Sequence, residues 1–415
     1  MNPAVITGPE LDRLRRRTIR RLFVGAGLGS VPFFAAVSAS PVAVFRISGS
    51  ETLSGVSVAA LSVGTGIGAA LFGQLMARRG RRAGLVAAYL MAAVGALFSV
   101  AGTSWGSVWL LIAGLLLFGA GHSANNLARY AAGELATAER RGAAVGLVVW
   151  AATIGAIVGP NVLTPAGGVA ERLGMDPLGG TYLVGMVLFG AAALFYFARL
   201  RPEPSTIAVE DLGVLPETGR GVWKLLGSSR VQIAVLAMAL SQFVMVLVMS
   251  VTPVHITSSG HALSVVGVVL SSHFVGMYAL SPLSGGIADR FGKIRAIWAG
   301  FGVLLLSVVA VAAAQSEAGI ALAGPMFLVG FGWSLSFVSG SALVSEGLAY
   351  ADRARLQGAV DTMVWSCSAL AAALGGVLLG AFGFFSLSLL AGFAVVAGAL
   401  VLGARYRGRL PAGVG

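Results

Sequence analysis

Residues 73–82 read GQLMARRGRR, and residues 285–293, which begin 212 positions later, read GGIADRFGK. Both stretches are basic, both contain a glycine that permits a tight turn, and both join the second apolar run of a series to the third. A further pair of similar stretches, GAGHS at 119–123 and GFGWS at 330–334, lies almost the same distance apart. The second half of the chain therefore repeats the plan of the first half.

The composition is too apolar for a water-soluble protein. Of the 415 residues 57% are hydrophobic and 11% are charged, whereas ordinary domains carry about 25% charged residues. Twelve apolar runs follow one another, each long enough to cross a bilayer as a helix. They span about 22–45, 52–76, 83–102, 107–131, 143–164 and 178–198 in the first half, and 231–256, 262–287, 295–315, 319–345, 359–382 and 384–404 in the second.

We therefore predict an all-α membrane protein with twelve transmembrane helices in two pseudo-symmetric six-helix bundles. The bundles are expected at residues 22–198 and 231–404. The charged, proline-containing segment 199–230 indicates a linker, and short segments at 1–21 and 405–415 flank the bundles. The 59 glycines agree with this prediction, because small residues let transmembrane helices approach closely.

The basic residues indicate the orientation in the membrane. If the N-terminus is inside, 25 of the 28 lysines and arginines lie in the termini and the even-numbered loops, leaving Arg46 and Arg172 outside and Arg129 within a span. The positive-inside rule then places both termini and the linker in the cytoplasm. The apolar run after the six arginines at 13–21 is too long for the core of a signal peptide.

The sequence argues against several other classes of protein. The net charge of +12 is spread between apolar runs, so we expect no nucleic-acid partner. A single cysteine, Cys367, excludes an internal disulfide. Neither a phosphate-binding loop nor a nucleophile elbow occurs, and the longest hydrophilic segment is the 32-residue linker. We therefore expect no enzymatic activity and no cofactor, with a proton gradient as the source of energy.

The two basic loops resemble the pattern G-x-x-x-D-R-x-G-R-R, which joins the second and third helices of each half in the major facilitator superfamily. The resemblance covers the chain from about residue 20 to 405 and implies the fold of that superfamily and secondary transport by rocking of two bundles about a central site. The matching residues are Gly73, Arg78, Gly80, Arg81 and Arg82 in the first half and Gly285, Asp289, Arg290, Gly292 and Lys293 in the second.

The first loop departs from the pattern at its acidic position, where Ala77 stands. The resemblance implies that this acid latches the loop to helix 11, so we expect closure on that side to be weaker. The arginines of the loop are expected to bridge to Glu134 and Glu139. The alternative is that they only mark the inner side of the membrane.

The fifth span resembles the helix-5 motif of superfamily antiporters through Gly146, Gly155, Gly159 and Pro160, although its final glycine pair is replaced at 161–164. The resemblance implies antiport. Glycines at these spacings also form a smooth surface for another helix, and proline bends its own helix. A packing seam without meaning for the direction of transport is therefore the alternative.

The fourth span carries His122, Asn125, Asn126 and Arg129 on one face of a helix. Such a face does not meet lipid, where a charged arginine costs about 3 kcal/mol or more, and we assign it to a central cavity. The alternatives are an interhelical hydrogen bond for His122, and for Arg129 an extended side chain that reaches the interface or pairs with Glu134.

The resemblance implies that helices 1, 4, 7 and 10 line the cavity, and three of these spans carry aromatic, methionine and polar residues at helical spacing. Such a wall suits a small amphipathic organic molecule, whereas ordinary helix packing is the alternative. The residues expected to bind substrate, besides those of the fourth span, are Phe33, Phe34, Gln242, Met245, Met249, Trp333, Phe337 and Ser341.

Proton coupling needs a buried group that changes charge, and His122, Asp361 and His273 are the candidates. Asp361 also suits a purely structural role, because an acid stabilises the N-terminal turns of its helix. His255 and His261 with His273 do not form a diagnostic metal set, and we predict no metal site.

The sequence thus predicts a multi-pass transporter of a bacterial cytoplasmic (inner) membrane that exports a small amphipathic organic molecule by proton antiport. The lipid bilayer and the substrate are its expected partners, and we expect a monomer. Proton-coupled or facilitated uptake of a small organic anion is one alternative, favoured by Arg129 and His122. A transporter-like receptor without transport is the other.

Overall fold

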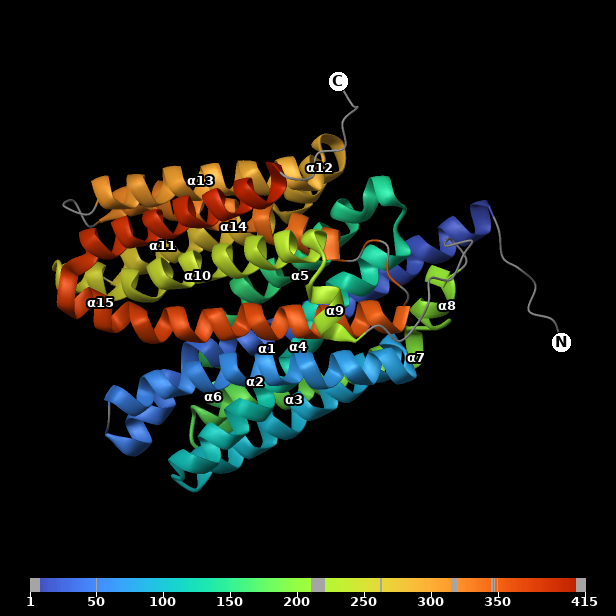
Figure 1. Ribbon diagram of the computed structural model, residues 1–415. Coiled ribbons are helices and arrows are strands. Elements are labelled where there is room, and N and C mark those ends of the chain that lie inside the picture. Colours follow the sequence, from blue (N-terminus) through green and yellow to red (C-terminus); the bar gives the residue numbers. More distant parts are fainter. Residues whose placement is uncertain are drawn as a thin grey trace.

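The computed structural model describes residues 8–49, 51–209, 221–261, 263–314, 319–344 and 350–407, together with Glu346 and Leu348. These residues are almost entirely helical and include no strand. Figure 1 shows long helices running side by side, with most of the first half, blue to green, grouped beneath the second half, yellow to red. The predicted linker residues 210–220 and the terminal residues 1–7 and 408–415 lie outside the described residues.

Six long helices form the first half, and each corresponds to one predicted apolar run. Two short elements, η1 (Ala138–Arg140) and α6 (Leu163–Arg172), lie between them and were not predicted. The long helices are α1 (Pro9–Ser48), α2 (Glu51–Arg79), α3 (Arg81–Ser104), α4 (Val108–Leu135), α5 (Arg141–Asn161) and α7 (Gly179–Arg199). The arginine-rich segment that we expected to precede the first span is therefore part of the same helix, α1.

The second half follows the short helices α8 (Pro204–Val209) and α9 (Val222–Leu226). Its elements are α10 (Ser229–Ser258), α11 (Leu263–Phe274), the π-helical turn η2 (Val275–Ala279), α12 (Ser281–Phe291), α13 (Lys293–Ala314), η3 (Ile320–Leu322), α14 (Ala323–Val344) and α15 (Tyr350–Arg407).

Two interruptions explain the count of spans in the second half. Among the described residues ten helices are long and apolar enough to cross a membrane, and the α11–α12 pair, bent by 40°, makes an eleventh. The 58-residue α15 turns sharply at Gly383, which has φ 74°, a left-handed conformation that glycine adopts without strain. The two parts of α15 are the last two spans, so the twelve-helix fold is confirmed.

The start of α1 and the end of α15 lie at the same end of the bundle in Figure 1, which we call the terminal face. The two repeated loops also turn at this face. Gly80 and Gly292, with φ of 88° and 93°, form the turns between α2 and α3 and between α12 and α13. We call the other end of the bundle the opposite face.

Glycines bring the two halves into backbone contact near the terminal face. Gly73 of α2 packs on Gly358 of α15, and a methyl group built on Gly73 would lie 2.9 Å from the Cα of Gly358. Gly142 of α5 packs in the same way on Gly285 of α12. A side chain at any of these positions would separate the halves, so the glycines permit a tightly closed terminal face.

Candidate functional site

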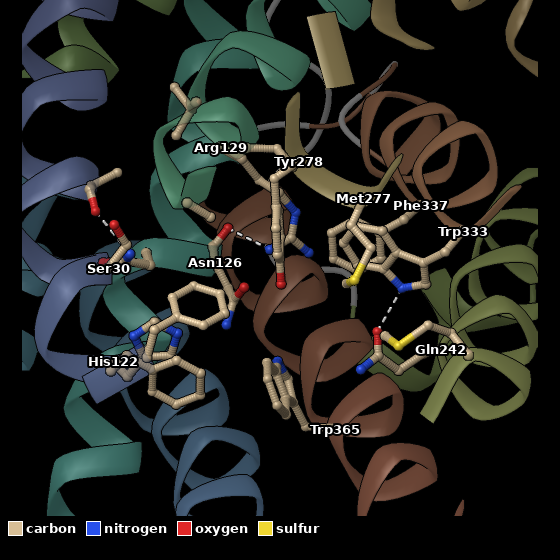
Figure 2. Close-up of a pocket in the computed structure, with 18 residues that line it drawn as sticks. Ser30, His122, Asn126, Arg129, Gln242, Met277, Tyr278, Trp333, Phe337 and Trp365 are labelled. Atoms are coloured by element: carbon tan, nitrogen blue, oxygen red, sulfur yellow. Dashed lines mark hydrogen bonds between the residues drawn. The ribbon is translucent and has the colours of Figure 1, made fainter. Parts of the chain in front are cut away.

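A small enclosed cavity lies between the two halves near the middle of the bundle (Figure 2). The centre of a water-sized sphere can occupy about 80 Å³ of it, which is room for a few water molecules. The cavity must therefore widen before it admits an organic molecule. Its lining includes ten of the residues predicted to bind substrate, namely Phe33, Phe34, His122, Asn125, Asn126, Arg129, Gln242, Met245, Trp333 and Phe337.

Two predicted residues, Met249 and Ser341, lie outside this lining, and several lining residues were not predicted. Two of the unpredicted residues, Ala26 and Ser30, belong to α1, and the others come from α5, η2 and α15, which the expectation of a cavity formed by helices 1, 4, 7 and 10 left out. They include Tyr278 of η2 and Trp365 of α15. Pro282, just beyond the π-helical turn, was the available signal, because proline removes a backbone donor and distorts the preceding helix.

A buried ion pair joins the two halves at the cavity wall. Nη2 of Arg129 on α4 donates to Oδ1 of Asp361 on α15 at 2.5 Å, and the two side chains are 2% and 1% exposed. The hydroxyl of Tyr130 donates to the same oxygen at 2.9 Å, and Nε of Arg129 donates to Oγ of Ser341 at 3.0 Å. Arg129 therefore pairs with Asp361 rather than with Glu134, and Asp361 lies beyond the first turn of α15, which begins at Tyr350.

Aromatic rings cover the guanidinium of this pair. The Cζ atom of Arg129 lies 4.3 Å from the ring centre of Tyr130 and 4.4 Å from that of Phe337, so both rings offer a cation–π contact. Oδ2 of Asp361 is buried and has no hydrogen-bond partner among the described residues. The carboxylate thus keeps one oxygen for an additional donor or a proton.

His122 contacts an aromatic ring rather than a polar partner. The imidazole of His122 stacks on the ring of Phe33 with 3.5 Å between the centroids and 8° between the planes. The indole of Trp365 contacts the ring of Phe33 edge-on. Nδ1 of His122 is buried without a hydrogen-bond partner among the described residues. His122 and Phe33 thus offer a flat surface with an unpaired ring nitrogen at its edge.

The two amides next to His122 have different surroundings. Asn125 donates to the carbonyl of Ala26 at 2.9 Å and accepts from the hydroxyl of Tyr89 at 2.5 Å, so it ties α4 to α1 and α3. Nδ2 of Asn126, in contrast, has no partner among the described residues. Asn126 is therefore the amide that is available to a ligand.

The wall from the second half is also amphipathic. Nε1 of Trp333 donates to Oε1 of Gln242 at 2.7 Å, and Nε2 of Gln242 donates to Ser368 at 3.3 Å. The indole stacks on Phe337 with 4.4 Å between centroids and meets Tyr278 edge-on. A ligand would contact aromatic faces here, together with the amide of Gln242, whose orientation is fixed by its two hydrogen bonds.

The histidines predicted for other roles lie away from the cavity. Nδ1 of His273 is 2.9 Å from the carbonyl of Met326, and His273 does not line the cavity. His255 stacks on Phe384 with 4.0 Å between centroids. Within the described part of the chain no three histidine, cysteine or acidic residues are placed to hold a metal ion.

Two carboxylates connect the halves at the terminal face. Glu134 accepts from Arg81 through Nε at 3.1 Å and through Nη2, and also lies 3.9 Å from Arg353 of the other half. Glu346, 212 positions after Glu134, lies 2.7 Å from Lys293. It also lies 3.7 Å from Arg141 of the first half and 3.9 Å from Arg230.

The ion-pair clusters around Glu134 and Glu346 are related by the sequence repeat. Lys293 follows Arg81 by 212 positions, and Arg353 follows Arg141 by the same number. Each carboxylate therefore binds the basic residue of its own half's loop and an arginine of the other half. The predicted bridge from the first loop to Glu134 is present, whereas exposed Glu139 interacts chiefly with its own backbone N–H and the side chain of Thr137.

The acidic position of the repeated loop acts in the second half alone. Asp289 accepts from the backbone N–H groups of Gly142 and Ala143, both at 2.8 Å, and so latches α12 to the first turn of α5. The first loop, which has Ala77 at this position, is held by Glu203 at the start of the linker. That carboxylate accepts from the N–H groups of Arg81 and Arg82, and burial raises its pKa above the ordinary value despite these bonds.

The helix-5 glycines face two partners. Gly146 packs on the backbone of Ser281 in α12, across the boundary between the halves, whereas Gly155 and Gly159 pack on α1. Pro160 lies in the last turn of α5. The three glycines therefore form close helix contacts, and these contacts place α5 where its residues 148, 149 and 152 reach the cavity.

Comparison with known proteins gives one family. The profile of the Major Facilitator Superfamily matches residues 22–368. An uncharacterized MFS-type transporter, YdeG of Bacillus subtilis (strain 168), is 33% identical over 93% of this chain and 91% of its own. The riboflavin transporter RfnT of Brucella anthropi is 26% identical over 93% and 94%. The crystal structure of the human organic anion transporter MFSD10 (TETRAN) has a TM-score of 0.73 at 14% identity, with 95% and 100% covered.

Proposed function

This chain belongs to the major facilitator superfamily and is a multi-pass membrane transporter rather than an enzyme, and we propose that it exports a small amphipathic organic molecule in exchange for protons. The lining of the central cavity supports this cargo. Aromatic faces of His122, Phe33, Trp333 and Phe337 suit a flat apolar body. The side chain of Asn126 offers an unpaired polar contact.

The observation that carries the proposal is the Arg129–Asp361 pair at the cavity wall. A proton on Asp361 removes the negative charge and leaves the guanidinium of Arg129 uncompensated beside the cavity. A fixed positive charge in a site of low dielectric repels a cationic cargo strongly. Loss of the proton restores the neutral pair and readmits the cargo. Proton and cargo then exclude each other, as antiport requires.

The same pair also supports coupling of protonation to movement. Arg129 belongs to the first half and Asp361 to the second, so the ion pair holds the halves together around the cavity. Protonation weakens this connection. The clusters around Glu134 and Glu346 join the halves at the terminal face in the same structure, and the two connections would open in turn during alternating access.

Flux measured in proteoliposomes tests this function. The protein is reconstituted with a panel of amphipathic cations, neutral aromatic molecules and organic anions, and flux is followed with and without an imposed pH gradient. We expect a cation to move against its gradient when protons move the other way. We expect Asp361→Asn, which leaves Arg129 uncompensated as the protonated acid does, to bind that cargo more weakly and to show no response to the pH gradient. Gradient-driven transport by Asp361→Asn would contradict the proposal.

Uptake of an organic anion is the second candidate, because Arg129 is the cation of the cavity lining. In this function a proton on Asp361 would release Arg129 to hold the anion, and proton and cargo would travel together. The two functions differ in the sign of one effect. Cargo binding weakens as the pH falls if a cation is exported, and strengthens if an anion is taken up.

A further inference from the structure

We propose that a groove on the outer surface of the first half, between the start of α1 and the start of α5, binds the headgroup of an anionic phospholipid. The groove is separate from the central cavity and has no part in the proposed transport cycle. The centre of a water-sized sphere can occupy about 570 Å³ of it. Its charged lining residues are Asp12, Arg15, Arg16, Arg20 and Arg140.

The charges of the groove favour a phosphate group. Four arginines face one aspartate there, and a guanidinium binds phosphate oxygens through two parallel hydrogen bonds. Arg15 is buried at 7% exposure, whereas Arg16, Arg20 and Arg140 are exposed. The groove therefore combines one fixed guanidinium with three that can close around a ligand.

The arginines come from two separate elements. Arg15, Arg16 and Arg20 lie within two turns of α1, and Arg140 is the last residue of η1. Thr137 and the first residues of α5 complete the wall on the side of η1. A headgroup in the groove would thus bridge α1 and α5, and both elements contribute to its recognition.

Apolar surface continues from the groove along the side of the bundle. Ile19 and Leu147 line the groove itself. Val24 of α1 and Ile154 of α5 follow in the direction of the opposite face, and with Leu147 they are 36% to 43% exposed. In a membrane protein such a surface contacts acyl chains. Free phosphate has no apolar part that could contact this surface, whereas a phospholipid has acyl chains. The groove and the surface together therefore fit a whole phospholipid.

The depth of the groove agrees with this ligand. The arginines lie directly before residue 22, where the first apolar span begins, and Ala143, Ala144 and Leu147 lie in the first turns of α5. The groove is therefore at the level where lipid headgroups meet the hydrocarbon. Basic pockets at this level bind anionic headgroups.

Native mass spectrometry of the delipidated, purified protein tests the site. Dioleoylphosphatidylglycerol, dioleoylphosphatidylcholine and soluble glycerol 1-phosphate are titrated separately. We expect phosphatidylglycerol to bind the wild-type protein with a defined first site, and the other two to bind much more weakly. The double variant Arg16→Gln/Arg20→Gln should weaken the first phosphatidylglycerol site by about tenfold to thirtyfold.

Arg13→Gln/Arg17→Gln is the matched control, because these arginines lie on the same helix with the same spacing and do not line the groove. It should change binding less than twofold. Arg140→Gln, on the other wall, should weaken binding by itself. Equal losses in the two double variants, or equal binding of phosphatidylcholine, would overturn the proposal. Equally tight binding of glycerol 1-phosphate would show a phosphate site without a lipid and would also overturn it.

Discussion

The central residues are a charged pair that the protein keeps out of water. Removing one partner of a buried ion pair typically costs about 3 to 5 kcal/mol, whereas the intact pair contributes little to stability. A contribution to the free energy of unfolding alone therefore does not explain the pair of Arg129 and Asp361. Their position at the wall of the cavity, between the halves, agrees with the role in proton exchange that we propose for them.

The sequence predicts one partner of this pair much better than the other. Arg129 shares a helical face with His122 and Asn126, and the period of the helix places all three at the cavity. Asp361 is 231 residues from Tyr130 and 232 residues from Arg129 in the chain. No local pattern connects residues so far apart, so their contact depends on how the two bundles pack.

His122 is expected to bind cargo rather than carry the proton. Its ring stacks on Phe33, and aromatic pairs contribute about 0.5 to 1.5 kcal/mol beyond the burial of area. His122→Gln should therefore weaken cargo binding by about twofold to tenfold, while the response of flux to a pH gradient remains. His122→Phe, which keeps the stack, serves as the control. A pH response lost in His122→Gln and kept in Asp361→Asn would assign the proton to His122 instead.

At the scale of the elements, the apolar runs predict all the long helices because each run must be apolar to cross a bilayer. The runs do not predict α6 or the π-helical turn η2, which depend on short stretches without a strong period. The runs also do not predict how closely helices of the two halves pack against each other. That property comes from pairs such as Gly142 and Gly285, which meet only after the halves have packed.

The two carboxylates of the terminal face should differ in their importance. The side chains of Glu134 and Arg81 are 1% and 0% exposed, whereas that of Glu346 is 23% exposed. Glu134→Gln should lower the free energy of unfolding by about 3 kcal/mol or more, and Glu346→Gln by less than about 1 kcal/mol. Thermal unfolding in detergent at low and high salt measures both. Equal losses in the two variants would show that burial does not decide their contributions.

Asp289 latches the second loop to α5, and an aspartate introduced at Ala77 should not form an equivalent latch in the first loop. Asp289 binds N–H groups at the first turn of α5, and its loss in Asp289→Ala should cost about 1 to 2 kcal/mol, as for other helix caps. The position equivalent to Gly142 in the second half is Ala354. Since α15 begins at Tyr350, the N–H of Ala354 already has a partner within the helix.

Ala77→Asp should therefore leave closure of the terminal face unchanged. Closure of the terminal face is measured by disulfide formation between one cysteine at the end of α2 and another at the start of α15, in a Cys367→Ser background. Asp289→Ala should slow the corresponding reaction between α5 and α12. A clear rise in α2–α15 cross-linking in Ala77→Asp would mean that the missing acid does weaken the first half.

At the scale of the whole molecule, the sequence repeat predicts the two-fold plan, because residues 212 positions apart occupy equivalent places in both halves. Glu134 and Glu346, or Arg129 and Ser341, are such pairs. The closed state of the cavity was not predictable. A transporter of this kind uses several conformations of one sequence, and the balance between them depends on contacts between the bundles.

The orientation of the molecule follows from its basic loops. Because 25 of 28 lysines and arginines fall on one side, the terminal face is expected in the cytoplasm. A reporter fused after Ser205, in α8, should be active inside the cell, and one fused after Arg172, at the end of α6, should be active outside. The reverse activities would contradict the orientation.

Proton release on cargo binding tests the central claim most directly. Purified protein in weakly buffered detergent solution, near the pH at which cargo affinity changes most, is mixed with a saturating amount of a transported cation, and a pH indicator reports the protons set free. The account predicts that the wild-type protein releases protons and that Asp361→Asn, at matched occupancy, releases none. Proton uptake by the wild-type protein, or unchanged release by Asp361→Asn, would contradict it.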